Sequence, residues 1–196
     1  LNESFEILKQ IVDARHTTKP AKMNGKKIDE ASIHALLELA NRAPSHGRTE
    51  PWRFVVLHGE PLQKFCTDHA EMYWEHVGAA TGNEAKYNTI KNQPNTVSHL
   101  IVVVMQRTPN TKILMMEEYA AVCAATQNML LGAEALGIAA IWSTGGLAHH
   151  SLMKSYLKLA TEDEVVALLM LGYSDAQLEP IARHSSGVEK ILNPNF

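Results

Sequence analysis

Residues 100–105 (L-I-V-V-V-M) constrain the fold more than any other stretch of the sequence. All six side chains are apolar, and β-branched residues favour strands. A strand that is apolar on both faces belongs in the middle of a sheet, with other elements covering each side. The run therefore predicts a central strand covered on both faces.

The rest of the chain predicts helices and further short strands around that strand. Ser4 is a suitable cap for a first amphipathic helix, Asp29 or Ser32 begins a second that stops at Pro44, and residues 82–96 show no clear pattern. Because helices and strands mix without strict βαβ alternation, the sequence favours one α+β domain over residues 1–196. Helical spacing is found in residues 4–14, 29–40, 62–81, 115–136 and 151–159, and apolar runs that predict strands in residues 52–57, 138–142 and 165–173.

Composition and charge exclude several classes of function. The formal charge is −3 without a block of like charges, so neither a nucleic-acid surface nor a polybasic membrane surface is expected. The most apolar run, residues 119–136, is interrupted by Gln127 and Glu134, which indicates a buried helix rather than a membrane span. Cys66 and Cys123 are far apart, which together with the lack of a signal-peptide pattern leads us to expect a reducing, cytoplasmic location.

Common catalytic motifs are missing from the sequence. It contains no G-x-G-x-x-G, no G-x-x-x-x-G-K-[ST], no G-x-S-x-G and no H-E-x-x-H. His149 and His150 are adjacent, and His69 and His76 share a helix face without an obvious third ligand. We therefore expect no metal site and assign no residue as a nucleophile or general base.

Three polar clusters are candidates for a binding site. The first, residues 15–18, follows the first predicted helix and either complements the helix dipole or forms an anion site from a guanidinium and hydroxyl groups. The second, residues 42–51, is either a proline-bounded connection in which Trp52 is simply a core residue, or a ligand-binding loop. The third, residues 140–146, is either a strand-to-helix turn or a small-residue segment whose backbone N–H groups approach a ligand.

Together, and in this order, these clusters resemble the flavin-dependent nitroreductase family. The matching segments are Arg15-His16-Thr17, residues 43–46 (A-P-S-H) with residues 50–54 (E-P-W-R-F), residues 137–145, and residues 171–173 (L-G-Y). Two departures from the family pattern are His16, in place of a second arginine, and Glu50, in place of a glutamine. A carboxylate cannot donate to a flavin ring nitrogen unless it is protonated, so the contact of Glu50 stays open.

The resemblance implies a fold, a cofactor and a reaction. The fold would have a mixed, mostly antiparallel central sheet flanked by helices, with the C-terminal tail wrapping a dimer partner. FMN would bind without a covalent bond between two subunits of a homodimer. It would carry hydride from NAD(P)H to a nitroaromatic, quinone or similar acceptor by a ping-pong mechanism, so that the flavin and no side chain carries the chemistry.

The resemblance also implies the roles of individual residues. Arg15, His16 and Thr17 of one subunit would bind the phosphate and ribityl chain. Arg42, Ser45 and His46 would come from the other subunit, Trp142, Ser143 and Thr144 would line the ring system, and Arg183 would reach the phosphate. Two alternatives remain: a flavin-binding relative with fragmentation or dehalogenation chemistry, and a cofactor-free dimeric binding protein.

Overall fold

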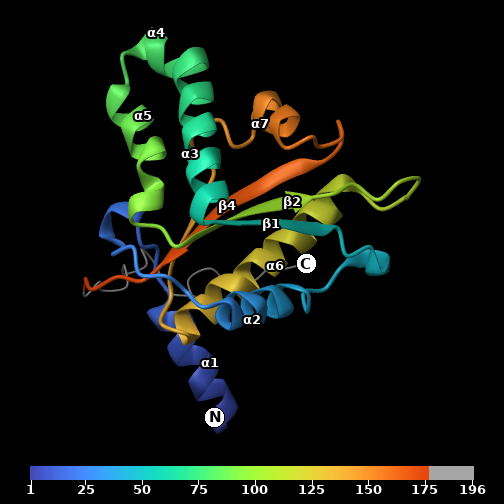
Figure 1. Ribbon diagram of the computed structural model, residues 1–196. Coiled ribbons are helices and arrows are strands. Elements are labelled where there is room, and N and C mark those ends of the chain that lie inside the picture. The colour runs from blue at the N-terminus through green and yellow to red at the C-terminus, as the bar shows by residue number, and fades with distance from the viewer. Residues whose placement is uncertain (177–196) are drawn as a thin grey trace, which may run out of the picture.

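The structure is a computed structural model that describes residues 1–176, and its centre is a four-stranded sheet (Figure 1). The strand order is β1-β2-β4-β3, and all three pairings are antiparallel. The expected α+β class with a mostly antiparallel sheet is confirmed. The strands are β1 (Trp52–His58), β2 (His99–Met105), β3 (Ala139–Ser143) and β4 (Glu164–Gly172).

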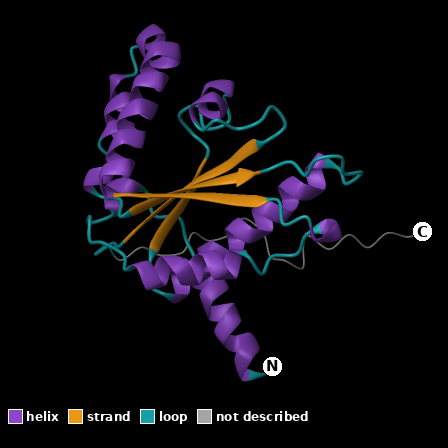
Figure 2. Ribbon diagram, turned by 45° about the vertical axis from the view of Figure 1, so that its right-hand side comes forward, coloured by secondary structure: helices purple, strands orange, loops and turns teal. Residues whose placement is uncertain are grey.

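Helices cover both faces of this sheet (Figure 2). On one face lie α2 (Glu30–Ala40) and α6 (Met115–Ala135), with α1 (Glu3–Ala14) against α6. The other face carries α3 (Gly59–Tyr73) and α7 (Ser151–Tyr156), and α5 (Glu84–Lys91) packs antiparallel to α3 as a helical hairpin.

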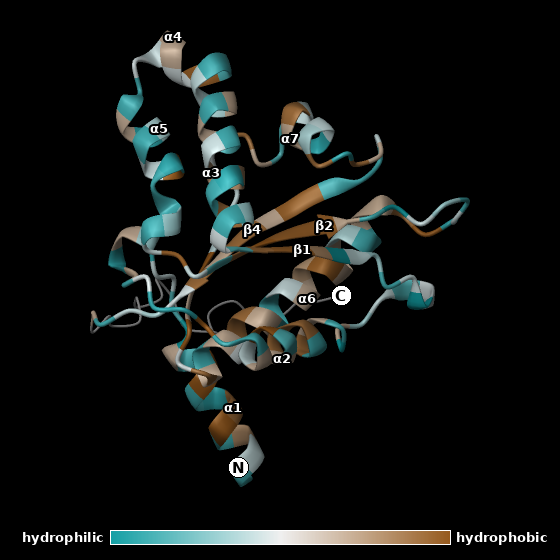
Figure 3. Ribbon diagram, viewed as in Figure 1, coloured by the Kyte–Doolittle hydropathy of each residue, from teal (hydrophilic) through white to brown (hydrophobic). Residues whose placement is uncertain are grey.

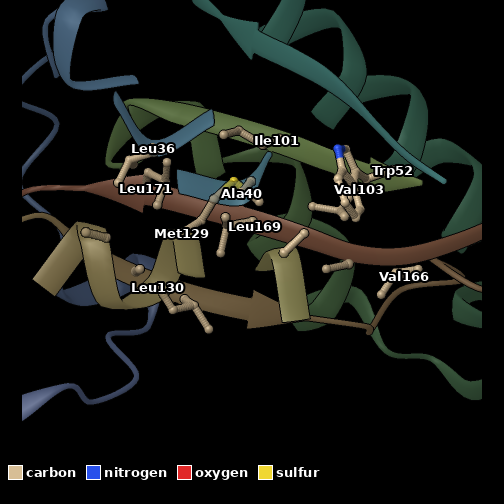
Figure 4. Packing of buried hydrophobic residues seen from close by; sticks show 14 of the residues in the cluster. Leu36, Ala40, Trp52, Ile101, Val103, Met129, Leu130, Val166, Leu169 and Leu171 are labelled. Atoms are coloured by element: carbon tan, nitrogen blue, oxygen red, sulfur yellow. The ribbon is translucent and has the colours of Figure 1, made fainter. Parts of the chain in front are cut away.

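The central strand β2 is buried along its whole length, as residues 100–105 predicted. Ile101 and Val103 belong to the hydrophobic cluster under α2 and α6, whereas Leu100 and Val102 belong to the cluster under α3 and α7. This alternation is the period of two of an extended chain. Figure 4 shows the first cluster, in which the labelled Leu36 and Met129 of the two helices lie beside strand side chains.

The small residues of α6 allow close packing within the chain. A Cβ atom at Gly132 would lie 2.5 Å from Leu39 Cδ1 and 2.9 Å from Leu36 Cδ2 of α2, so a larger residue at this crossing would displace these two leucine side chains. Ala120 is exposed instead, and Ala124 is half-buried. The close neighbour of Gly132 is therefore α2 of the same chain.

Several element boundaries differ from the prediction. Asn2, not Ser4, caps α1, because its side-chain oxygen accepts from the Phe5 N–H at 2.9 Å. Asp29 caps α2 as predicted. The single helix expected over residues 62–81 is divided into α3, a π-helical turn (Trp74–Gly78) and the short α4 (Ala79–Thr81).

Two further expectations concern the C-terminal tail and membrane-spanning helices. The C-terminal tail that would wrap a partner lies outside the described residues. In residues 1–176, no helix combines the length and the apolar character needed to cross a membrane.

A buried histidine at the start of β2 leads to a prediction about acid stability. His99 is 5% exposed, its Nδ1 lies 2.9 Å from Ser98 Oγ, and its ring centroid lies 5.1 Å from that of His58. Burial, and then the charges of His58 and Lys27, lower the pKa of His99 below 6.5. The unfolded chain then binds the proton first, so stability falls as pH drops through about 6.5 toward the lower folded-state pKa.

We expect His99→Gln to weaken this loss of stability with falling pH. The measurement is the urea midpoint between about pH 5 and pH 7.5, the interval in which histidine changes charge. His34→Gln, on the exposed surface of α2, serves as the control and should keep the native slope. A native slope in the His99 variant would contradict the prediction.

Candidate active site

The first cluster lies at a small pocket where α1 ends. The pocket has a volume of about 130 Å³ and is called the Arg15 pocket below. Arg15 follows the last residue of α1, and the Thr18 N–H donates to the Ala140 carbonyl oxygen at 3.0 Å. This bond fixes the segment against β3. The lining residues are Arg15, His16, Thr18, Leu130, Glu134, Gly137, Ile138, Ala139, Ala140, Ser174 and Ala176.

The neighbouring Thr17 and Thr18 differ in burial and in whether they line this pocket. Thr17 is exposed and is not among the lining residues, whereas Thr18 is 1% exposed and lines the pocket. The cluster predicted from the sequence includes Thr18, but the residue roles implied by the resemblance named Thr17 and left Thr18 out. Sequence reasoning missed Glu134, whose Oε2 lies 4.0 Å from His16 Nδ1; no local pattern links these two residues.

The second cluster forms a constrained loop. Gly47, Arg48 and Glu50 all have positive φ angles, 61°, 55° and 45°, a conformation that costs energy for the two non-glycine residues. The Ser45 hydroxyl accepts from the Glu50 N–H at 3.2 Å, and Trp52 Nε1 donates to Asn41 Oδ1 at 3.0 Å. The loop is therefore more than a short connection, and Trp52 is a core residue that anchors it.

This loop forms a second pocket with the N-terminal half of α6. His46 Nδ1 lies 3.0 Å from Glu117 Oε1, and Glu117 Oε2 accepts from the Leu114 N–H at 3.0 Å. The bond from Leu114, followed by the one to His46, lowers the pKa of Glu117. The second pocket, called the His46 pocket, has a volume of about 490 Å³ and is lined by Pro44, Ser45, His46, Glu117, Ala120, Ala121 and Ala124.

The two pockets lie at opposite ends of α6. Glu117 lines the His46 pocket and Glu134 lines the Arg15 pocket, and at about 1.5 Å of rise per residue they are about 25 Å apart along the helix. Arg42 precedes the loop and is exposed. One chain therefore does not bring the first and second clusters together.

The third cluster ends β3. Trp142 is half-buried against the α2–α6 side of the core, and its Nε1 donates to the Val166 carbonyl oxygen at 3.2 Å, so its side-chain donor is already used. Ser143 Oγ accepts from the Gly145 N–H at 3.4 Å, and Thr144 is exposed. The side chains of Trp142 and Ser143 are therefore engaged within the chain, whereas Thr144 and the backbone of this segment are open to a ligand.

Two further expectations concern Arg183 and the presence of a metal site. Arg183 lies outside the described residues. Within residues 1–176, no group of three or more histidine, cysteine, aspartate or glutamate side chains is arranged to hold a metal ion.

Comparison with known proteins gives a consistent family. The family model described as "Nitroreductase family" matches residues 12–173. "Putative NAD(P)H nitroreductase YfhC" of Bacillus subtilis (strain 168) is 26% identical over 169 residues, which are 86% of this chain and 85% of that protein. "Putative NAD(P)H nitroreductase YdjA" of Escherichia coli (strain K12) is 28% identical over 141 residues, 71% of this chain and 74% of that protein.

Solved structures agree with this result. A nitroreductase-like family protein from Bacillus cereus has a TM-score of 0.80 at 26% identity and covers 96% of each chain. A nitroreductase with bound FMN from Bacteroides fragilis has a TM-score of 0.73 at 20% identity, covering 98% of this chain and 100% of that one, which supports the fold alone. The resemblance noted in the sequence is confirmed, and the chain belongs to the nitroreductase family.

Proposed function

We propose that the protein is an FMN-dependent oxidoreductase that uses NAD(P)H to reduce a nitroaromatic, quinone or similar acceptor. Family membership supports the reaction class, and relatives carry NAD(P)H nitroreductase in their names. The observation that carries the proposal is the division of the candidate residues between the two ends of α6. A second copy of the chain would bring the Arg15 pocket of one subunit to the His46 pocket of the other.

The residues present fit a flavin mononucleotide in their donor chemistry. The Arg15 pocket offers a guanidinium, an imidazole and the backbone around Gly137, donors that suit a phosphate. The Glu134 carboxylate also lines the pocket and lies 4.0 Å from His16 Nδ1, so the guanidinium of Arg15 is the main anion ligand. At about 130 Å³ the pocket is smaller than the about 300–1,000 Å³ of sites that enclose a whole ligand. The remainder of the cofactor would therefore need the partner's loop.

FMN, when bound, supplies the hydride and electron transfer. In this proposal Arg15 and His16 bind and orient the phosphate end, and Ser45 and His46 of the second subunit close the site. The backbone N–H groups after Trp142 face the ring system, where fixed donors favour charge that develops on reduction.

An exposed apolar face on α1 supports the homodimer. The helix has no buried residue, and Figure 3 shows apolar residues along it where it projects from the sheet. Phe5, Ile7, Leu8 and Val12 are 46–51% exposed, which is unusual for a face of this size on a monomer. We expect the protein to sediment as a dimer at micromolar concentration; a monomer would contradict the assembled site.

The visible absorption spectrum of the purified protein, with FMN added if it is colourless, tests the proposed function. Two flavin bands that bleach anaerobically with NADH or NADPH are the expected result. Bands that do not bleach would favour non-reductase flavin chemistry. No FMN uptake would favour a cofactor-free binding protein and overturn the proposal.

A further inference from the structure

We propose that His69 is a positioning residue for the candidate site, because it holds the turn that follows Trp142, Ser143 and Thr144. The turn consists of Gly145 and Gly146 and is called the glycine turn below. The effect of His69 on cofactor binding rests on the proposed function, whereas its effect on the turn does not.

His69 contacts the glycine turn from α3, 77 positions earlier in the sequence. It is 3% exposed, and its Nε2 is hydrogen-bonded to the Gly146 carbonyl oxygen. The His69 ring and Ile90 pack closely against Gly146, because a Cβ atom at Gly146 would lie 2.9 Å from His69 Nε2 and 3.0 Å from Ile90 Cδ1. The histidine is therefore in direct contact with the backbone it would hold.

The partner atom determines which ring nitrogen carries the proton. A carbonyl oxygen only accepts, so His69 Nε2 is the donor, and Nδ1 is buried without a hydrogen-bond partner within residues 1–176. Burial lowers the pKa of His69, the bond to Gly146 opposes this, and the nearby Lys86 ammonium lowers it again. A neutral ring with its single N–H directed at Gly146 is the form that this environment favours.

The backbone at the turn needs such support. Gly146 has φ 67° and the next residue, Leu147, has φ 70°. A left-handed conformation is costly for leucine and persists only where surrounding contacts enforce it. Leu147 packs against the small cluster of Ala70, Tyr73 and Ile90, which lies between α3 and α5, so packing and the His69 bond act together.

The glycine turn directly continues the segment proposed to face the ring system. The Gly145 N–H makes only a long bond, 3.4 Å, to Ser143 Oγ, which leaves its direction weakly fixed from that side. The Lys86 side chain is close, since a Cβ atom at Gly145 would lie 3.4 Å from its Nζ. The Gly146 carbonyl shares a peptide plane with the Leu147 N–H, so the bond from His69 fixes that plane directly and restrains the amides of Gly145 and Gly146 through the chain. Such preorganised donors bind a ligand without further ordering.

His69→Leu and His69→Gln separate this role from simple packing. Leucine removes the donor and also the unpartnered nitrogen, so the variant is expected to fold. Glutamine keeps an N–H that can reach Gly146. Leu62→Val, a buried position on the same helix outside the turn, controls for a general loosening of α3.

Hydrogen exchange of residues 142–148 and the Kd for FMN are the two readouts. We expect His69→Leu to speed exchange in this segment and to raise the Kd about tenfold, the effect of one lost hydrogen bond. The glutamine variant should stay within about twofold of the native Kd, as should Leu62→Val.

Each result has a distinct meaning. Native exchange and native Kd in His69→Leu, with or without a lower melting temperature, would overturn the inference. Faster exchange at every segment in both His69→Leu and Leu62→Val would also overturn it, because the effect would then be structural. If the native protein takes up no FMN, the proposed function fails, while exchange in residues 142–148 still tests whether His69 holds the turn.

Discussion

Replacing Arg107 with methionine is expected to lower the free energy of unfolding by about 3–5 kcal/mol. Glu118 is 1% exposed on the first turns of α6, and Arg107 Nη1 donates to its Oε2 while Nη2 donates to the Ile113 carbonyl oxygen at 2.7 Å. The other carboxylate oxygen is buried without a partner in the described residues. Methionine keeps the apolar stem and removes the charge, which leaves a buried carboxylate uncompensated.

The matched variants make this prediction specific. Glu118→Leu should cost less, because the remaining guanidinium is 17% exposed and reaches water. The double variant Arg107→Met, Glu118→Leu should be more stable than Arg107→Met alone, since no buried charge is left. Asp13→Ala, in an exposed pair with Lys9, should change stability little. Equal losses in Arg107→Met, Glu118→Leu and Asp13→Ala would show that the pair contributes no more than a surface contact.

The pH dependence of the Arg107→Met deficit gives a second check. Burial alone would raise the pKa of Glu118, but hydrogen bonds from Thr108 and Arg107 outweigh it and hold the pKa below 4.5. The stability from the pair is therefore present above about 4.5 and is lost as pH falls through the lower folded-state pKa. Without Arg107 the carboxyl can become neutral in acid. The difference in urea midpoint between variant and native protein should therefore narrow as pH falls.

Arg15→Ala is expected to weaken FMN binding by about 1.5–3 kcal/mol, or about 10- to 150-fold in Kd, which is the range for a lost hydrogen bond to a charged group. Arg15 is half-buried at the end of α1, lines the Arg15 pocket, and forms no ion pair within residues 1–176. Its guanidinium is therefore available to an anion. The measurement is a flavin fluorescence titration of the apoprotein.

Riboflavin, which lacks the phosphate, identifies the contact. Arg15→Ala should weaken FMN and leave riboflavin almost unchanged, and Arg15→Lys should lie in between because a point charge replaces the fork. Lys19→Ala, an exposed basic neighbour outside the pocket, should retain native affinity. Full flavin content in purified Arg15→Ala would show that the pocket does not bind the phosphate.

The parts of the fold that were predictable are those decided by local pattern. Residues 100–105 had to become a central strand because both faces are apolar, and Asp29 begins α2 because its side chain can cap Ser32 N–H at 2.8 Å. The α3–α5 hairpin was not predictable. Its second helix is polar, and it depends on Ile90 and Tyr87 packing against α3 and the glycine turn.

In the candidate site, too, local pattern predicted some residues, and contacts between distant segments determined the others. Arg15 and the loop containing Ser45 were proposed from residue type and order, and each lines a pocket in the structure. Thr18 was not separated from Thr17, because the difference arises where Thr18 meets β3: its N–H donates to the Ala140 carbonyl oxygen, and its side chain is buried. The His46–Glu117 contact joins residues 71 positions apart, a distance that no local pattern reaches.

The bond from Thr18 to Ala140 also bears on how the protein avoids aggregation. Among the strands of residues 1–176, β3 lies at an edge of the sheet, and free backbone groups on an edge can recruit strands from other molecules. Thr18 occupies the Ala140 carbonyl with the segment that carries Arg15 and His16, so the residues that line the pocket also cover this edge. A variant that loosens this segment would therefore expose the backbone groups of β3 to other molecules. Such a variant is expected both to bind its ligand more weakly and to become turbid on mild heating.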